Sequence, residues 1–152
     1  MPPRRLVVPL KQRMLAGTSL LGHFPDLPLF VETADGHYTA AEFRVDTAAN
    51  VTEVGVDWAL LRNVPIVGSR ITLPVMHGGG MGTWTGWLGT IRVRVPTWAG
   101  IEFEWPCFFR EMRPSGLPLQ LGLAGVVDDV RVIADGKLTS GGQTGCLVIE
   151  EL

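Results

Sequence analysis

The residues best suited to chemistry lie in one segment, residues 43–52, which reads Phe-Arg-Val-Asp-Thr-Ala-Ala-Asn-Val-Thr. Asp46 follows an apolar, strand-forming run and precedes small and hydroxyl-bearing residues. A carboxylate at such a position costs free energy if it is buried without a partner. A fold that keeps it there usually gives it a partner or a chemical role, so Asp46 is the first candidate for a functional residue.

Other reactive side chains are scattered along the chain. The two cysteines, Cys107 and Cys146, are far apart, and each lies among apolar residues, which favours buried free thiols over a disulfide. No CxxC pattern occurs, and His23, His37 and His77 are widely separated. We therefore expect neither a metal site nor a cofactor.

Charge and hydropathy patterning argue against two classes of partner. The net charge is -2 and like charges do not cluster, so we expect neither nucleic acid nor an anionic membrane as a partner. No apolar run approaches the roughly 18 residues of a membrane span. The first ten residues are basic but lack the apolar stretch of a secretory signal, which favours a cytoplasmic protein.

The elements around Asp46 are short and rich in β-forming residues. The 19 glycines and 11 prolines separate these runs, which favours many short strands. Asp-Gly pairs at 35–36 and 135–136 predict turns. Short helices are predicted at 56–63 and 123–130. The sequence thus predicts one all-β domain, a barrel or two packed sheets, with strands at 27–33, 38–45, 70–76, 90–95, 101–109, 130–134 and 146–152.

Three segments, in order, resemble those of retropepsin-like aspartic proteases. Residues 45–49, Val-Asp-Thr-Ala-Ala, resemble the family's active-site turn, and Thr52 matches the Thr or Ser that follows it. Residues 77–87 form a glycine-rich segment at the position of the family's flap. Residues 119–127, followed by 130–136, resemble its apolar-Gly segment and the strand after it.

The resemblance implies a fold and an oligomeric state. It predicts a retropepsin-like acid protease barrel, half of a pepsin-type bilobal fold, over residues 27–152. Residues 1–26 are then an N-terminal arm, an extra strand or a removable segment. Because the chain carries one aspartate motif where pepsin-type enzymes carry two, it implies a homodimer in which Asp46 of each subunit meets at the two-fold axis.

The implied activity is that of an aspartic endopeptidase acting on a peptide or protein substrate. Two carboxylates about 3 Å apart share one proton, so one of them activates water while the other polarises the scissile carbonyl. By resemblance, the Thr47 hydroxyl contacts the opposite subunit and Ala48 continues the active-site turn. Ala49 and Asn50 lie beside the substrate backbone. The flap residues Gly80, Met81 and Trp84 close over it.

Three positions depart from the family pattern and leave alternatives open. Ala48 stands where the family mostly has glycine, and Arg44 and Gln120 stand at apolar positions. A non-catalytic dimeric module that binds a peptide or protein is one alternative. The other is an unrelated small β-barrel in which Asp46 is a turn residue that accepts hydrogen bonds from nearby backbone amides.

Overall fold

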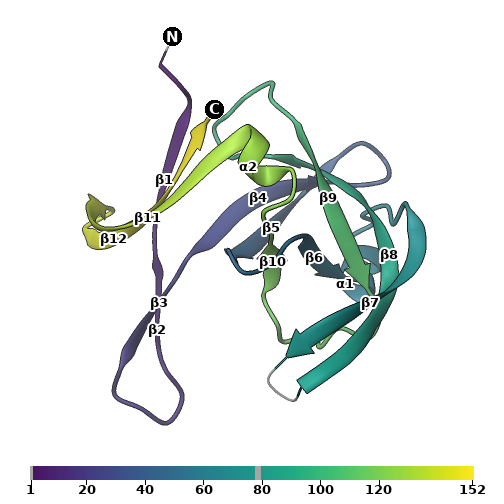
Figure 1. Ribbon diagram of the computed structural model, residues 1–152. Coiled ribbons are helices and arrows are strands. Elements are labelled where there is room, and N and C mark those ends of the chain that lie inside the picture. The colour runs from purple at the N-terminus through teal and green to yellow at the C-terminus, as the bar shows by residue number, and fades with distance from the viewer. Residues whose placement is uncertain (1, 78–79) are drawn as a thin grey trace.

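The computed structural model describes residues 2–77 and 80–152 and is built almost entirely of strands (Figure 1). Two short helices, α1 (Val56–Leu61) and α2 (Val126–Asp129), interrupt them. The all-β prediction with short helices is therefore confirmed. The strands are β1 (Arg5–Pro9), β2 (Lys11–Met14), β3 (Leu21–Phe24), β4 (Asp26–Glu32), β5 (Tyr38–Val45), β6 (Thr52–Gly55), β7 (Ser69–His77), β8 (Gly80–Arg94), β9 (Phe103–Arg110), β10 (Leu119–Leu121), β11 (Val130–Ser140) and β12 (Gln143–Glu151).

Six of these strands close into a barrel. The main sheet runs β4-β5-β10-β6-β9-β8-β7, and β4 also pairs with β8, so the sheet returns on itself while β7 extends it. The β5–β10 and β6–β9 pairs are parallel, and the other pairs in the sheet are antiparallel. Closure leaves few free edges in the barrel and gives it one enclosed apolar interior.

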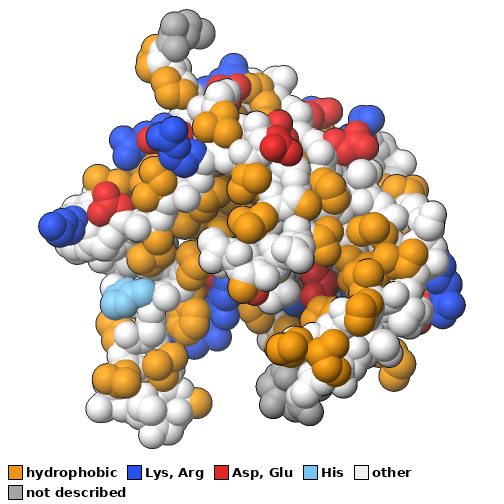
Figure 2. All heavy atoms as spheres, in the orientation of Figure 1, with side chains coloured by type: hydrophobic (Ala, Val, Ile, Leu, Met, Phe, Trp, Pro, Cys, Tyr) orange, Lys and Arg blue, Asp and Glu red, His pale blue; other side chains and the backbone are white. Residues whose placement is uncertain are grey.

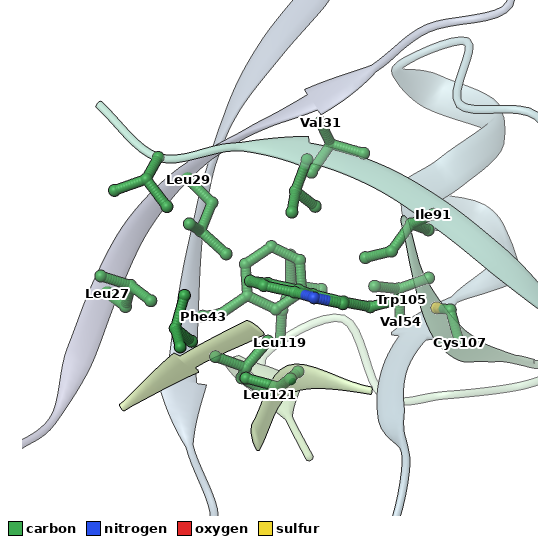
Figure 3. Packing of buried hydrophobic residues seen from close by; sticks show 14 of the residues in the cluster. Leu27, Leu29, Val31, Phe43, Val54, Ile91, Trp105, Cys107, Leu119 and Leu121 are labelled. Atoms are coloured by element: carbon green, nitrogen blue, oxygen red, sulfur yellow. The ribbon is translucent and has the colours of Figure 1, made fainter. Parts of the chain in front are cut away.

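The barrel interior holds the largest buried side chains (Figure 3). Trp105 and Phe43 are fully buried at its centre, and Phe103 stacks on Trp105 with ring centroids 5.5 Å apart. Burying one large apolar side chain contributes about 1.5–3 kcal/mol. Trp105 also donates from Nε1 to Asp129 Oδ2 at 2.8 Å, which fixes α2 against the barrel.

Both cysteines are free and buried, as predicted from their apolar surroundings. Burial raises the pKa of the Cys107 thiol well above its usual range, and a hydrogen bond with the backbone of Val54 only partly opposes this effect. A thiol held neutral in this way is a packing group and not a nucleophile.

A second sheet, β1-β12-β11, packs beside the barrel. Leu147 and Ile149 of β12 belong to the same buried cluster as the barrel core. β1 pairs with β12 along its whole length, from Arg5 opposite Glu150 to Pro9 opposite Cys146. Residues before 27 therefore supply a strand of this sheet and, through β2 and β3, a hairpin.

One predicted turn is wrong. The Asp-Gly pair at 135–136 lies inside β11, where Asp135 Oδ1 accepts hydrogen bonds from the backbone N–H groups of Lys137 and Leu138 at 2.8 and 3.2 Å. These bonds accompany a shift of register between Asp135 and Thr139, a β-bulge or irregularity through which the strand continues instead of turning. The chain reverses later, at Gly141 and Gly142, where φ is 59° and 78°. Two glycines with positive φ suit a two-residue hairpin loop.

Two hairpins project from the same side of the molecule (Figure 1). One is formed by β2 and β3 and the other by β7 and β8. Both carry exposed apolar side chains, including Leu20 on the first and Met76 and Met81 on the second (Figure 2). Among the described residues, neither helix has the length and apolar character that crossing a membrane requires.

Candidate active site

Asp46 opens the turn that joins β5 to β6, and this turn lies over a third strand. β5 and β6 follow each other in the sequence but do not pair, because β10 lies between them. β10 runs parallel to β5, with Leu121 opposite Val45, and the Asp46 N–H donates to Leu121 O at 3.0 Å. The turn therefore lies against a strand that comes more than seventy residues later in the sequence.

Several hydrogen bonds fix the turn to the segment after β10. The N–H groups of Leu123 and Ala124 donate to the carbonyls of Ala49 and Asn50 at 3.1 and 2.8 Å. The Gly122 N–H donates to the buried Thr52 hydroxyl at 3.1 Å. Because both ends of the turn are held by backbone contacts, Asp46 has a defined position before any ligand binds.

Gly122 has no room for a side chain. A Cβ at this position would lie 2.3 Å from the carbonyl carbon of Val51 and 2.8 Å from the Thr52 nitrogen, which are backbone atoms that cannot rotate away. We expect Gly122→Ala to destabilise the fold by about 1–3 kcal/mol or more, as overpacking does, measured by denaturant unfolding. Gly136→Ala is the control, because no atom lies within 4 Å of its added Cβ. Equal stability of the two variants would contradict the close contact.

Both oxygens of the Asp46 carboxylate have partners. Oδ1 accepts from the Ala48 backbone N–H at 2.9 Å, and Oδ2 accepts from the Gln120 side-chain amide at 3.0 Å. The side chain is half-buried. Two hydrogen bonds from different segments orient the carboxylate instead of leaving it free to rotate in solvent.

Ala48 fits the turn without strain. Among the described residues, the non-glycine residues with positive φ are Asn63, Thr97 and Met112, so Ala48 does not have the positive φ that disfavours an L-residue. Its side chain is exposed. Ala48 therefore keeps the turn intact, and its backbone N–H donates to Asp46.

Asp46 lines a cleft of about 680 Å³. Trp84 of β8 lies in the same cleft, together with Gln120 and the loop residues Leu117 and Pro118. The Arg110 guanidinium stacks on the Trp84 ring, with its central carbon 3.7 Å from the ring centroid. The cleft thus combines a carboxylate, an aromatic face and apolar walls, which is the usual composition of a ligand site.

A buried ion-pair cluster forms the inner wall of this cleft. The Glu53 side chain is 5% exposed, and its Oε1 accepts from Arg113 Nε at 2.8 Å and from Arg110 Nη1 at 3.1 Å. Arg113 also donates to the carbonyls of Leu117 and Pro118. The cluster therefore joins β6 and β9 to the loop that leads into β10.

Arg44 also faces the cleft. It forms a two-pronged ion pair with Asp26, at 2.8 and 3.1 Å, and its guanidinium lies 4.3 Å from the centroid of the Phe24 ring. Side chains alternate between the two faces of β5, so Phe43 points into the core and its neighbour Arg44 points away from it. Arg44 therefore places a positive charge at the cleft.

The remaining predicted site residues lie around the turn or at the hairpin tip. Thr47 and Asn50 are exposed on the turn, and Ala49 is half-buried there. Gly80 and Met81 begin β8, and Met81 is 69% exposed. Neither is among the residues that line the cleft. Residues 78 and 79, which belong to the predicted flap, lie outside the described residues.

Sequence reasoning missed several cleft residues. Gln120 was noted only as a departure from an apolar pattern, although its position between buried Leu119 and Leu121 places it on the opposite face of β10. That alternation was the available signal. No pattern in the sequence pointed to Glu53, Arg110 and Arg113 as cleft residues, because their pairing depends on β6 lying beside β9.

No protein-family model matches the chain, and no curated protein matches its sequence. Among solved structures, the chain is similar to a retropepsin-like aspartic protease from Rickettsia conorii, at 11% sequence identity and a TM-score of 0.41. The similarity covers 99% of this chain and 96% of that one.

Proposed function

We propose that this protein is an aspartic endopeptidase that acts as a homodimer. The observation that carries the proposal is the placement of Asp46: a carboxylate immediately after β5, oriented by Ala48 and Gln120, in a cleft of about 680 Å³. The residue pattern of the turn, Asp-Thr-Ala with a later Thr52, resembles that of retropepsin-like proteases.

One subunit supplies one such aspartate, and the proposed chemistry needs two. In the dimer, the exposed turn residues Thr47 and Ala48 of both copies would meet, bringing the two Asp46 carboxyl groups close enough to share a proton. The ionised member takes a proton from water as the water attacks the scissile carbonyl. The protonated member polarises that carbonyl and then protonates the leaving amine.

A second candidate function is a dimeric module that binds peptides without cleaving them. The Gln120 amide favours it, because it donates to Asp46 Oδ2 and so competes for an oxygen that the dyad would use. Under the proposed function this amide must release or share that oxygen when the dimer forms.

The test is digestion of a mixed peptide library at acidic to mildly acidic pH, with cleavage sites read by mass spectrometry. The proposal predicts cleavage that a statine-type inhibitor suppresses, because such compounds mimic the transition state. The rate per chain should rise with protein concentration until the dimer is saturated. Peptide binding without cleavage would support the non-catalytic module. Cleavage at the same rate with and without the inhibitor would contradict an aspartic mechanism.

A further inference from the structure

We propose that the substrates are peptide segments carrying acidic side chains, bound in a positively charged groove that extends from Asp46. This inference rests on the proposed function for the cleavage step, but the groove itself is a feature of the single chain. It is formed by two adjoining hollows of about 680 and 350 Å³, which share Arg44, Leu117 and Pro118. We call this continuous surface the Arg groove.

The Arg groove concentrates positive charge. Six cationic side chains line it against four carboxylates, whereas the whole chain has a net charge of -2. Figure 2 shows Lys and Arg side chains gathered where the hollow between the two projecting hairpins meets the body of the molecule. The cations are Lys11, Arg13, Arg44, Arg62, Arg110 and Arg113, and the carboxylates are Asp26, Glu42, Asp46 and Glu53.

Two of these cations have no carboxylate partner among the described residues. Lys11 pairs with Glu42 at 2.8 Å and Arg44 pairs with Asp26, but Arg13 and Arg62 form no such ion pair. Instead, Arg13 lies 5.6 Å from the centroid of the Phe24 ring, and Arg62 lies 4.8 Å from that of Trp58 and donates from Nη1 to the Trp58 carbonyl at 3.4 Å. Aromatic contact holds each guanidinium in place while leaving N–H donors for a ligand.

A third cation, which is only partly compensated, lines the same cleft as Asp46. Arg110 and Arg113 share the single carboxylate of Glu53. Arg113 uses Nε, Nη1 and Nη2 for hydrogen bonds within the protein. Arg110 donates to Glu53 from Nη1 alone, and it stacks on Trp84 in the cleft. Its other N–H groups are therefore available to a ligand in the cleft.

These charges favour a peptide carboxylate over other anions. A guanidinium binds a carboxylate through two parallel hydrogen bonds, and the Arg groove presents several guanidinium groups to the acidic side chains of an extended peptide. Trp84, Leu117 and Pro118 supply apolar contacts between them. Because Asp46, the residue to which the proposed function assigns peptide hydrolysis, lines the same cleft, a peptide fits this groove better than a nucleic acid does.

The test measures binding separately from hydrolysis, using the full chain with Asp46→Asn. The probes are a fluorescein-labelled octapeptide with four Glu residues and the same peptide with four Gln residues, compared by fluorescence anisotropy at low salt. We expect the Glu peptide to bind at least tenfold more tightly. Adding Arg13→Gln and Arg62→Gln should lower that preference at least fivefold, with the fold checked by circular dichroism.

The matched control removes the same charge elsewhere. Arg131→Gln with Lys137→Gln alters β11, outside the Arg groove, and should change binding less than twofold. The inference is overturned if the Glu and Gln peptides bind equally, if the control weakens binding as much as the groove variant, or if octathymidylate binds more tightly than the Glu peptide. Failure of hydrolysis with an intact Glu preference would instead overturn the proposed function alone.

Discussion

Replacing Asp46 with asparagine is expected to lower peptide hydrolysis by about 10²–10⁴-fold, the range that general acid–base catalysis contributes. The amide can neither take a proton from water nor carry the proton that the dyad shares. The fold should survive, because the Asn oxygen can still accept the hydrogen bond that the Ala48 N–H gives to Asp46. Initial cleavage rates on a peptide identified from the library measure the effect.

The control for this variant is Asp128→Asn, which makes the same chemical change on the exposed surface of α2. It should keep full activity. Mixing wild-type chains with an excess of the Asp46→Asn chain sharpens the test, since mixed dimers contain one catalytic aspartate. The hydrolysis rate per wild-type chain should then fall, because most wild-type chains would be in mixed dimers. Hydrolysis that survives Asp46→Asn unchanged would remove Asp46 from the mechanism.

Glu53→Gln is expected to lower the free energy of unfolding by about 3–5 kcal/mol, as does loss of one partner from a buried ion pair. The carboxylate is the acceptor for two arginines, and its loss leaves both guanidinium charges in a largely buried wall. The loop from Arg113 to Pro118 depends on this cluster, so the cleft should lose order together with stability. Denaturant unfolding of the two proteins measures the difference.

Glu104→Gln provides the matched comparison. Glu104 pairs with Arg92 at 3.6 Å, and both side chains are more than half exposed. Surface pairs of this kind contribute about 0–1 kcal/mol. A loss at Glu53 no larger than the loss at Glu104 would show that the buried cluster does not stabilise the fold.

Local patterns predicted the strands well where one face of the strand is buried. Ile91, Val93 and Val95 alternate with arginines in the sequence, and all three are buried in the structure. The prediction failed at Asp135-Gly136, because an Asp-Gly pair suits both a hairpin loop and a bulge. The strand continued past this pair and the chain reversed at Gly141 and Gly142, because two glycines with positive φ suit the hairpin loop better.

The candidate site shows a similar division. Asp46 and Trp84 were predicted from the sequence, and the structure brings them into one cleft. The arginines of that cleft were not predicted as site residues, because a charged residue in a strand usually faces solvent. Their arrangement follows from the parallel pairing of β6 with β9, which brings Arg110 to Glu53. Pairings of this kind depend on contacts between distant segments.

The most direct test of the central claim is a crystal structure of the protein at a concentration where it self-associates. We expect a two-fold symmetric dimer in which the carboxyl oxygens of the two Asp46 side chains lie about 3 Å apart, close enough to share a proton. Assemblies in which those oxygens are remote from each other would contradict it.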